Sequence, residues 1–92
     1  MVNTSYEWNI AKARSNQRKH GIDFADLEQV FEDESAITLP DADHEEERYI
    51  IMGMDARGRL VVVVHTWRGD PVRIISARRA TRKERREYEG DR

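Results

Sequence analysis

The stretch that most constrains the fold of this 92-residue chain is residues 72–81, which read VRIISARRAT. The segment begins with alternating β-branched residues, and this pattern predicts a strand. Strict alternation would give one face of the strand Val72, Ile74 and Ser76 and the other face Arg73, Ile75 and Ala77. Because burying an unpaired guanidinium is costly, arginines on such a strand need either carboxylate partners or a phosphate ligand. The residues alone leave both interpretations open.

The size and composition of the chain predict one small domain over residues 1–92, with a modest core. The chain has no cysteine, which excludes disulfides and thiolate metal sites and fits a reducing cytosol. The longest apolar run, residues 60–64, is too short to span a bilayer, and the first residues lack the pattern of a signal peptide. We therefore expect a cytoplasmic protein without a membrane segment.

The charges are distributed unevenly, although the formal net charge is only −2. Residues 23–47 contain eleven acidic residues and no lysine or arginine, whereas residues 57–92 contain eleven basic residues and five acidic ones. The C-terminal part of the chain therefore carries a positive field, which suits a partner that bears phosphate groups.

Capping signals predict two helices in the N-terminal half. Asn9 can cap a basic helix over residues 10–20, and Gly21 follows it as the residue that accepts a left-handed conformation. Asp23 opens a second helix. Its apolar residues fall at helical spacing and are expected in the core: Phe24, Leu27, Val30 and Phe31.

The remaining segments predict strands and one last helix. The strands are expected over residues 6–8, 36–39 (stopped by Pro40), 48–54, 59–67 and from 72 onward. Thr81 and Glu84 form a capping box for a charged helix over residues 82–89. The order β-α-α-β-β-β-β-α predicts an α+β fold with a small antiparallel sheet.

The acidic run over residues 41–47 contains His44 and could be read as a metal site. It lacks the glycine and the ligand spacing of a calcium loop. We therefore expect a solvated acidic loop, and no metal or cofactor.

Several short motifs occur together and in a fixed order in this chain. They are Glu7-Trp8-Asn9, residues 19–24 (KHGIDF), Phe31, residues 40–44 (PDADH), and residues 73–81 followed by Glu84 and Tyr88. With this ordered set the chain resembles the BrnT family of bacterial type II toxins over nearly its full length. One departure is Trp67, where a polar or acidic residue is more usual.

The resemblance implies a RelE-like fold with two N-terminal helices and a C-terminal helix. It also implies a toxin with endoribonuclease activity that inhibits translation and is neutralised by a BrnA-like, DNA-binding antitoxin. Because an antitoxin of that type is dimeric, we expect a heterotetramer or a larger complex.

Cleavage of RNA without a metal requires deprotonation of the 2′-hydroxyl, stabilisation of the phosphorane and protonation of the leaving 5′-oxygen. Arginine suits the second task, and histidine can titrate near neutrality. We expect catalytic roles for Arg78, Arg68 and His65, with His20 as a further candidate base. The residues expected to bind RNA or its phosphates are Arg73, Arg79, Arg82, Lys19 and Tyr88.

Each of these assignments has a structural alternative. His65 can be a hydrogen-bonded strand histidine, His20 a C-terminal helix cap, and Tyr88 the residue that docks the last helix. A second hypothesis for the whole chain is a non-catalytic module that binds nucleic acid or an acidic protein through the same basic surface. The two hypotheses differ in whether a titratable group lies within reach of Arg68 and Arg78.

Overall fold

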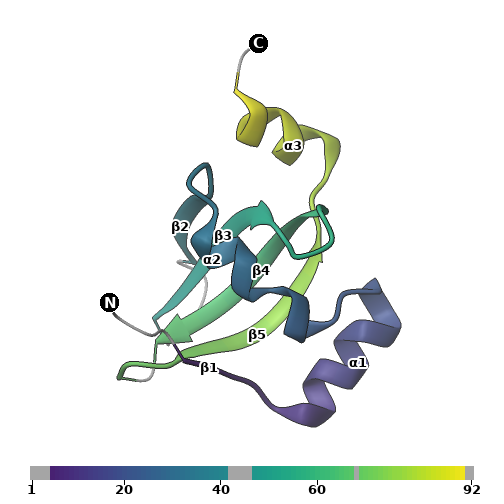
Figure 1. Cartoon of the computed structure of the whole chain (residues 1–92), viewed down its shortest axis with the longest axis vertical. Helices are drawn as coiled ribbons and strands as arrows, with labels where there is room; N and C mark the ends of the chain where they lie inside the picture. The colour runs from purple at the N-terminus through teal and green to yellow at the C-terminus, as the bar shows by residue number, and fades with distance from the viewer. Residues whose placement is uncertain (1–4, 42–46, 68, 91–92) are drawn as a thin grey trace.

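A five-stranded sheet with the strand order β1-β5-β4-β3-β2 organises the computed structural model, which describes residues 5–41, 47–67 and 69–90 (Figure 1). β1 runs parallel to β5, and all other neighbouring strands are antiparallel. The strands are β1 (Tyr6–Glu7), β2 (Ile37–Asp41), β3 (Arg48–Met54), β4 (Leu60–Trp67) and β5 (Val72–Arg79). The predicted α+β class and order of elements are confirmed, with the parallel β1 as the one exception to an antiparallel sheet.

The helical elements leave the two faces of the sheet differently covered. They are α1 (Ile10–His20), the 3₁₀ helix η1 (Phe24–Asp26), α2 (Glu28–Glu32) and α3 (Arg82–Glu89). The segment from α1 to α2 packs on what we call the α1 face, formed by Ile51, Val61, Val63, Val72, Ile74 and Ala77. On the other side, the α3 face, Met52, Leu60 and Val62 are buried with Ala80 and Tyr88 packed against them. Beyond those contacts, α3 extends past the end of the sheet (Figure 1).

The first helix is confirmed, whereas the second is shorter than predicted. Asn9 caps α1 by accepting a hydrogen bond from the Lys12 amide (3.0 Å), and Gly21 follows at φ 70°. The prediction of one continuous helix after Asp23 was wrong, because a 3₁₀ turn precedes the short α2. The carbonyl of Asp26 accepts a hydrogen bond from the Ala56 amide, between β3 and β4, instead of one from a continuing helix. The expected apolar residues still reach the core: Phe24, Leu27 and Val30 are buried and Phe31 packs against them.

Several strand ends also differ from their predicted bounds. β1 ends at Glu7 rather than at Trp8, and β2 begins at Ile37 rather than at Ala36. Pro40 was expected to stop its strand but lies inside β2. β2 is an edge strand, where a residue without an amide proton is tolerated. β4 begins at Leu60 rather than at residue 59.

A β-bulge interrupts β5 and changes which residues share a face. His65 of β4 pairs with Ile74, whereas the preceding residue Val64 pairs with Ser76, so Ile75 is an extra residue on β5. Strict alternation therefore fails after Ile74. Ser76 joins Arg73 on the α3 face, and Ala77 joins Val72 and Ile74 in the core of the α1 face.

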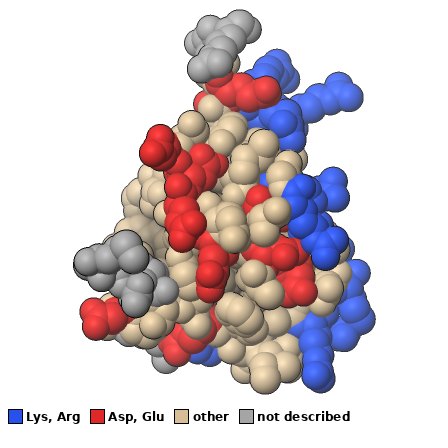
Figure 2. Space-filling view, in the orientation of Figure 1, with Lys and Arg blue, Asp and Glu red and all other residues tan. Residues whose placement is uncertain are grey.

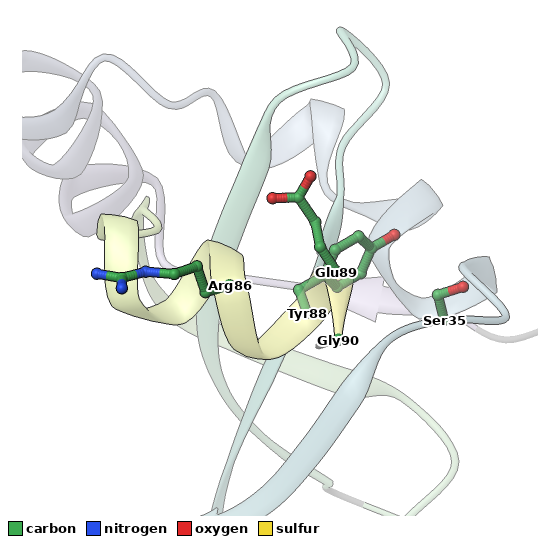
Figure 3. A pocket seen from close by; sticks show the side chains of 5 residues that line it. All are labelled: Ser35, Arg86, Tyr88, Glu89 and Gly90. Atoms are coloured by element: carbon green, nitrogen blue, oxygen red, sulfur yellow. The ribbon is translucent and has the colours of Figure 1, made fainter. Parts of the chain in front are cut away.

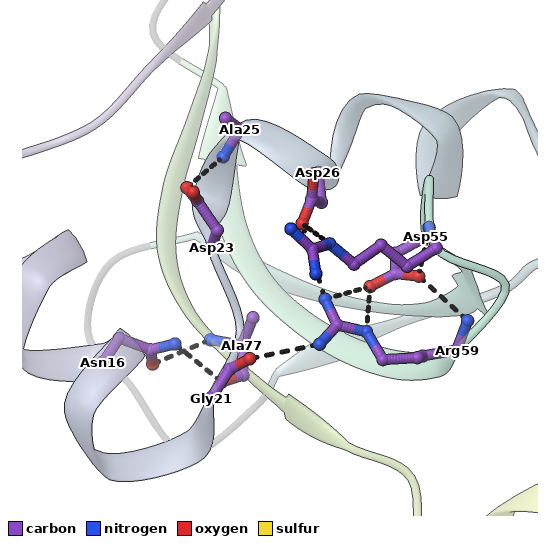
Figure 4. Close-up of polar contacts among 9 residues, drawn as sticks. Asn16, Gly21, Asp23, Ala25, Asp26, Asp55, Arg59 and Ala77 are labelled. Carbon is purple, nitrogen blue, oxygen red and sulfur yellow. Dashed lines mark hydrogen bonds and ion pairs between the residues drawn. The ribbon is translucent and has the colours of Figure 1, made fainter.

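Asn16 holds α1 against β5 through hydrogen bonds, which add to the few apolar contacts that this helix makes. Its side-chain nitrogen donates to the Ala77 carbonyl (2.9 Å), and its side-chain oxygen accepts from the Ala77 amide (3.1 Å) (Figure 4). Asn16 is 8% exposed, so both bonds are shielded from water.

Within the described ranges, no helix is long and apolar enough to cross a membrane.

Candidate active site

Arg78 lies at the end of β5 on the α3 face, where it pairs with Val62 of β4. Two of its nitrogens donate to Glu84 of α3, Nη1 to Oε1 at 2.8 Å and Nη2 to Oε2 at 2.9 Å. Nη1 also donates to the Arg79 carbonyl at 3.2 Å. Three hydrogen bonds thus fix the guanidinium, although 45% of the side chain stays exposed to solvent.

Glu84 owes its position to the start of α3. Its carboxylate accepts a hydrogen bond from the Thr81 amide (2.8 Å), and the Thr81 hydroxyl accepts one from the Glu84 amide (3.2 Å). This is the predicted capping box, which is confirmed. The hydrogen bond from Arg78 is the main cause that lowers the pKa of Glu84 to about 2. The same bond raises the pKa of Arg78, so both groups are charged at neutral pH.

One edge of the Arg78 guanidinium remains available. A guanidinium has five N–H donors, and the contacts to Glu84 and to the Arg79 carbonyl use the two terminal nitrogens. The Nε–H has no partner within residues 5–41, 47–67 and 69–90, and Nη2 keeps its second N–H. Nε and Nη2 together form a fork of the kind that binds two oxygens of a phosphate.

Tyr88 anchors the far end of α3, and Asp33 holds it there. The Tyr88 hydroxyl donates to Asp33 Oδ2 at 2.7 Å, and the same oxygen accepts from the Met54 amide. Burial alone would raise the pKa of Asp33, but the hydrogen bonds from Tyr88 and from the Met54 and Ser35 amides lower it overall. The bond to Asp33 is the main cause that raises the pKa of Tyr88, so the phenol is neutral at physiological pH. Asp33 was not predicted as a site residue, since nothing in the sequence links it to a tyrosine 55 positions away.

A hollow of about 370 Å³ lies beside this contact and is lined by Ser35, Arg86, Tyr88, Glu89 and Gly90. In Figure 3 the Tyr88 ring extends from α3 toward Ser35, whereas Arg86 points away along the helix. Tyr88 therefore borders a hollow, and aromatic side chains can stack on the bases of single-stranded RNA.

The other residues expected in the site are spread over the molecule. Arg73 lies on the α3 face and, because of the bulge, only four positions of β4 separate it from Arg78, which is roughly 13 Å along a strand. Its Nη1 is 3.7 Å from Glu7 Oε1. Arg79 pairs with Val61 and so belongs to the α1 face. Arg82 begins α3, and Lys19 lies in the last turn of α1. Arg68 falls outside the described residues.

Neither histidine lies beside Arg78. His65 is 3% exposed and packs edge-on against Phe31 with ring centroids 4.8 Å apart. Burial is the main cause that lowers the pKa of His65, and its Nδ1 has no hydrogen-bond partner. Its position on the face away from Arg78 does not support the expected catalytic role. His20 is exposed in the last turn of α1.

The acidic loop lies mostly outside the described residues, because residues 42–46 are not among them, and neither reading of it is tested. Elsewhere in the described ranges, no three His, Asp or Glu side chains are placed to hold a metal ion. Trp67, the residue that departs from the family pattern, is 50% exposed at the end of β4.

Comparison with known proteins identifies the chain. A family model described as "Ribonuclease toxin, BrnT, of type II toxin-antitoxin system" matches residues 8–84. The crystal structure of the Brucella abortus ribonuclease toxin BrnT superposes with a TM-score of 0.71 at 30% sequence identity, covering 87% of this chain and 100% of that one. No curated protein sequence matches the chain.

The fold and these matches define the class, which is that of ribonuclease toxins of type II toxin–antitoxin systems. The chain belongs to the BrnT family of these toxins, as its ordered motifs predicted.

Proposed function

We propose that this toxin is a metal-independent endoribonuclease that acts in the cytoplasm and inhibits translation by cutting RNA at Arg78. The observation that carries the proposal is the orientation of the Arg78 guanidinium. Glu84 binds both terminal nitrogens, and within the described residues Nε and Nη2 keep unused N–H donors on a side chain that is 45% exposed. A fixed fork of this kind matches two non-bridging oxygens of a phosphodiester.

The proposed reaction is an in-line attack of the 2′-oxygen on the adjacent phosphorus. A bond forms between that oxygen and phosphorus, and the bond from phosphorus to the 5′-oxygen breaks. The products are a 2′,3′-cyclic phosphate and a 5′-hydroxyl. Negative charge accumulates on the non-bridging oxygens at the phosphorane, and Arg78 would stabilise it there.

Proton transfer is assigned to water in this proposal. Glu84 has a pKa of about 2 and is therefore a weak base, and His65 is buried on the other face. We propose Arg68 as a second cation that stabilises the phosphorane. Arg73 and Tyr88 are proposed to bind the RNA outside the cleaved bond. Catalysis by charge stabilisation without a matched base predicts a modest rate.

The proposed inhibitor is a BrnA-like, DNA-binding antitoxin. Membership of a type II toxin–antitoxin family implies a cognate antitoxin. We propose that it brings carboxylates to Arg78, Arg79 and Arg82, because the acidic segment over residues 23–47 would repel such a chain elsewhere. With a dimeric antitoxin, the complex would contain two copies of each chain or more.

The decisive experiment incubates the purified protein with labelled RNA in excess chelator and identifies the ends of the products. We expect cleavage that persists in chelator and leaves a 2′,3′-cyclic phosphate. Activity that disappears in chelator and returns with magnesium or manganese would contradict the mechanism. Tight binding without any cleavage would favour the non-catalytic binding module instead.

A further inference from the structure

The two consecutive arginines at the end of β5 serve different surfaces. Arg78 pairs with Val62 and points to the α3 face, and Arg79 pairs with Val61 and points to the other side. A hollow of about 260 Å³ lies beside Arg79, between the β3–β4 turn and α3. Its lining is Gly58, Arg59, Leu60, Arg79, Ala80 and Arg85.

The arginines of this hollow differ in what they already bind. Arg59 is held by the fully buried carboxylate of Asp55 (2.8 Å) and lies 3.5 Å from Asp26, so its charge is compensated within the fold. Arg79 and Arg85 have no carboxylate partner in the described part of the chain, and both are exposed. Two cations at the rim of a hollow are therefore left for an external anion.

The last turn of α1 extends this positive surface. Arg59 Nη1 donates to the Gly21 carbonyl at 3.1 Å, which joins the end of α1 to the β3–β4 turn (Figure 4). That turn of α1 carries Arg18 and Lys19. We call the set Arg18, Lys19, Arg79 and Arg85 the basic strip. Figure 2 shows lysine and arginine along one edge of the molecule, with acidic residues over the middle of the same view.

We infer that the basic strip binds the phosphate backbone of single-stranded RNA next to the bond that is cut. The inference rests on the proposed function, because it takes Arg78 as the point of cleavage. Consecutive Cα atoms are about 3.8 Å apart, so an RNA strand that crosses the end of β5 meets Arg78 first and then Arg79. Arg85 lies on the same hollow as Arg79, and Arg59 connects that hollow to the end of α1.

The lining of the strip suits RNA, and the antitoxin proposed above would meet only one of its members, Arg79. Protein interfaces depend on apolar and aromatic anchors at their centre. The exposed large apolar residues in the described ranges are Ile10, Leu39 and Trp67, and none of them belongs to the strip. Leu60, which lines the hollow, is 2% exposed and offers no such anchor. Charge without an apolar centre is the pattern expected for backbone contacts to a nucleic acid.

The test measures binding of a fluorescent, uncleavable 2′-O-methyl RNA of about twelve nucleotides by anisotropy at several salt concentrations. Loss of one phosphate contact to a single strand lowers the slope of log K against log salt concentration by about 0.7. We expect this loss in Arg79→Ala and in Arg85→Ala. The control is Lys12→Ala, which removes one positive charge from the first turn of α1, at the end of the helix away from the strip.

A second readout separates the strip from the catalytic site. Cleavage of the long RNA should fall at least tenfold more than cleavage of a dinucleotide in the strip variants, whereas Arg78→Ala should lose both. Slopes equal to that of Lys12→Ala would overturn the inference. So would unchanged RNA binding with a loss of affinity for the antitoxin, since the strip would then be a protein-docking surface. If the wild type cuts no RNA, the proposed function fails, but the anisotropy measurement still decides the role of the strip.

Discussion

Glu84 binds Arg78 through both carboxylate oxygens, and the same carboxylate accepts the Thr81 amide that begins α3. One side chain therefore orients the arginine of the proposed site and also caps the helix that covers that end of the sheet. A change at position 84 is expected to alter stability and RNA cleavage together, whereas a change at Arg78 leaves the capping box in place.

Arg78→Ala should reduce RNA cleavage by about 10²–10³, which is the usual cost of losing one group that stabilises charge in a transition state. Arg78→Lys should recover part of the loss, because an ammonium supplies charge but no fork. Cleavage rates and circular dichroism check both. Arg57→Ala is a matched control, since Arg57 is also an exposed arginine paired with a carboxylate, that of Asp26. A folded Arg78→Ala protein that cuts RNA at the wild-type rate would contradict the catalytic role of Arg78.

Stability should depend on pH through Glu84. Its folded-state pKa, about 2, lies below the ordinary value of 4.5 because of Arg78. The unfolded chain therefore binds the proton more readily, and the contribution of the pair is complete above about pH 4.5 and is lost as the pH falls toward 2. Urea unfolding between pH 2 and 5 should show this loss in the wild type and not in Glu84→Gln.

Glu87→Gln is the control for that experiment, because it removes the same charge from an exposed position of the same helix. Identical pH profiles for Glu84→Gln and the wild type would mean that the Arg78 pair contributes nothing to folding.

Tyr88 combines a hydroxyl that binds Asp33 with a ring beside a hollow, and two substitutions separate these roles. Tyr88→Phe should lower the free energy of unfolding by about 1 kcal/mol, the value of an ordinary hydrogen bond rather than of one to a buried charge, because the pair is partly exposed. RNA affinity should stay close to that of the wild type, since the ring is kept. Tyr88→Ala should lose both stability and RNA affinity. Equal RNA affinities in calorimetry for Tyr88→Ala and the wild type would leave Tyr88 with the docking role alone.

Asn16→Ala should destabilise the protein by about 1–3 kcal/mol, because it leaves the amide and carbonyl of Ala77 buried without partners. A lower urea midpoint would show it. Gln17→Ala, at the next and exposed position of the same helix, should have almost no effect. Similar midpoints for the two variants would mean that α1 is held to β5 by other contacts.

Antitoxin binding can be tested with an Arg79→Glu, Arg82→Glu double variant in calorimetry. Reversal of two charges should weaken binding by several kcal/mol if carboxylates of the antitoxin contact these residues. The mass of the wild-type complex in solution checks the proposed stoichiometry of two copies of each chain or more. Unchanged affinity would place the interface elsewhere, most plausibly on the two N-terminal helices.

Most of the fold could be predicted from the sequence, because the ends of the helices are set by interactions between residues close together in the chain. Asn9, Gly21, Thr81 and Glu84 act on atoms a few residues away, and the structure confirms all four. The second helix was predicted too long because its break depends on a tertiary contact. The Asp26 carbonyl is bound by the Ala56 amide, thirty residues further along the chain.

The site was less predictable, because it depends on contacts between distant segments. The motif and the capping box pointed to Arg78 and to Glu84 separately, but not to the ion pair between them. His65 was expected to be catalytic because histidine titrates near neutrality, and only the fold shows that the core surrounds its ring. The residues next to His65 in the sequence do not show which face of the sheet its ring occupies or what packs against it.

The β-bulge at Ile75 has a consequence for aligning this chain with its relatives. Before the bulge the core positions of β5 are even-numbered, Val72 and Ile74, and after it they are odd-numbered, beginning with Ala77. A relative with a regular strand here would need one residue fewer to present the same side chains. A single-residue gap at position 75 would then mark the loss of the bulge with both arginines still equivalent. The same gap placed at position 79 would align Arg78 with the second arginine of the relative.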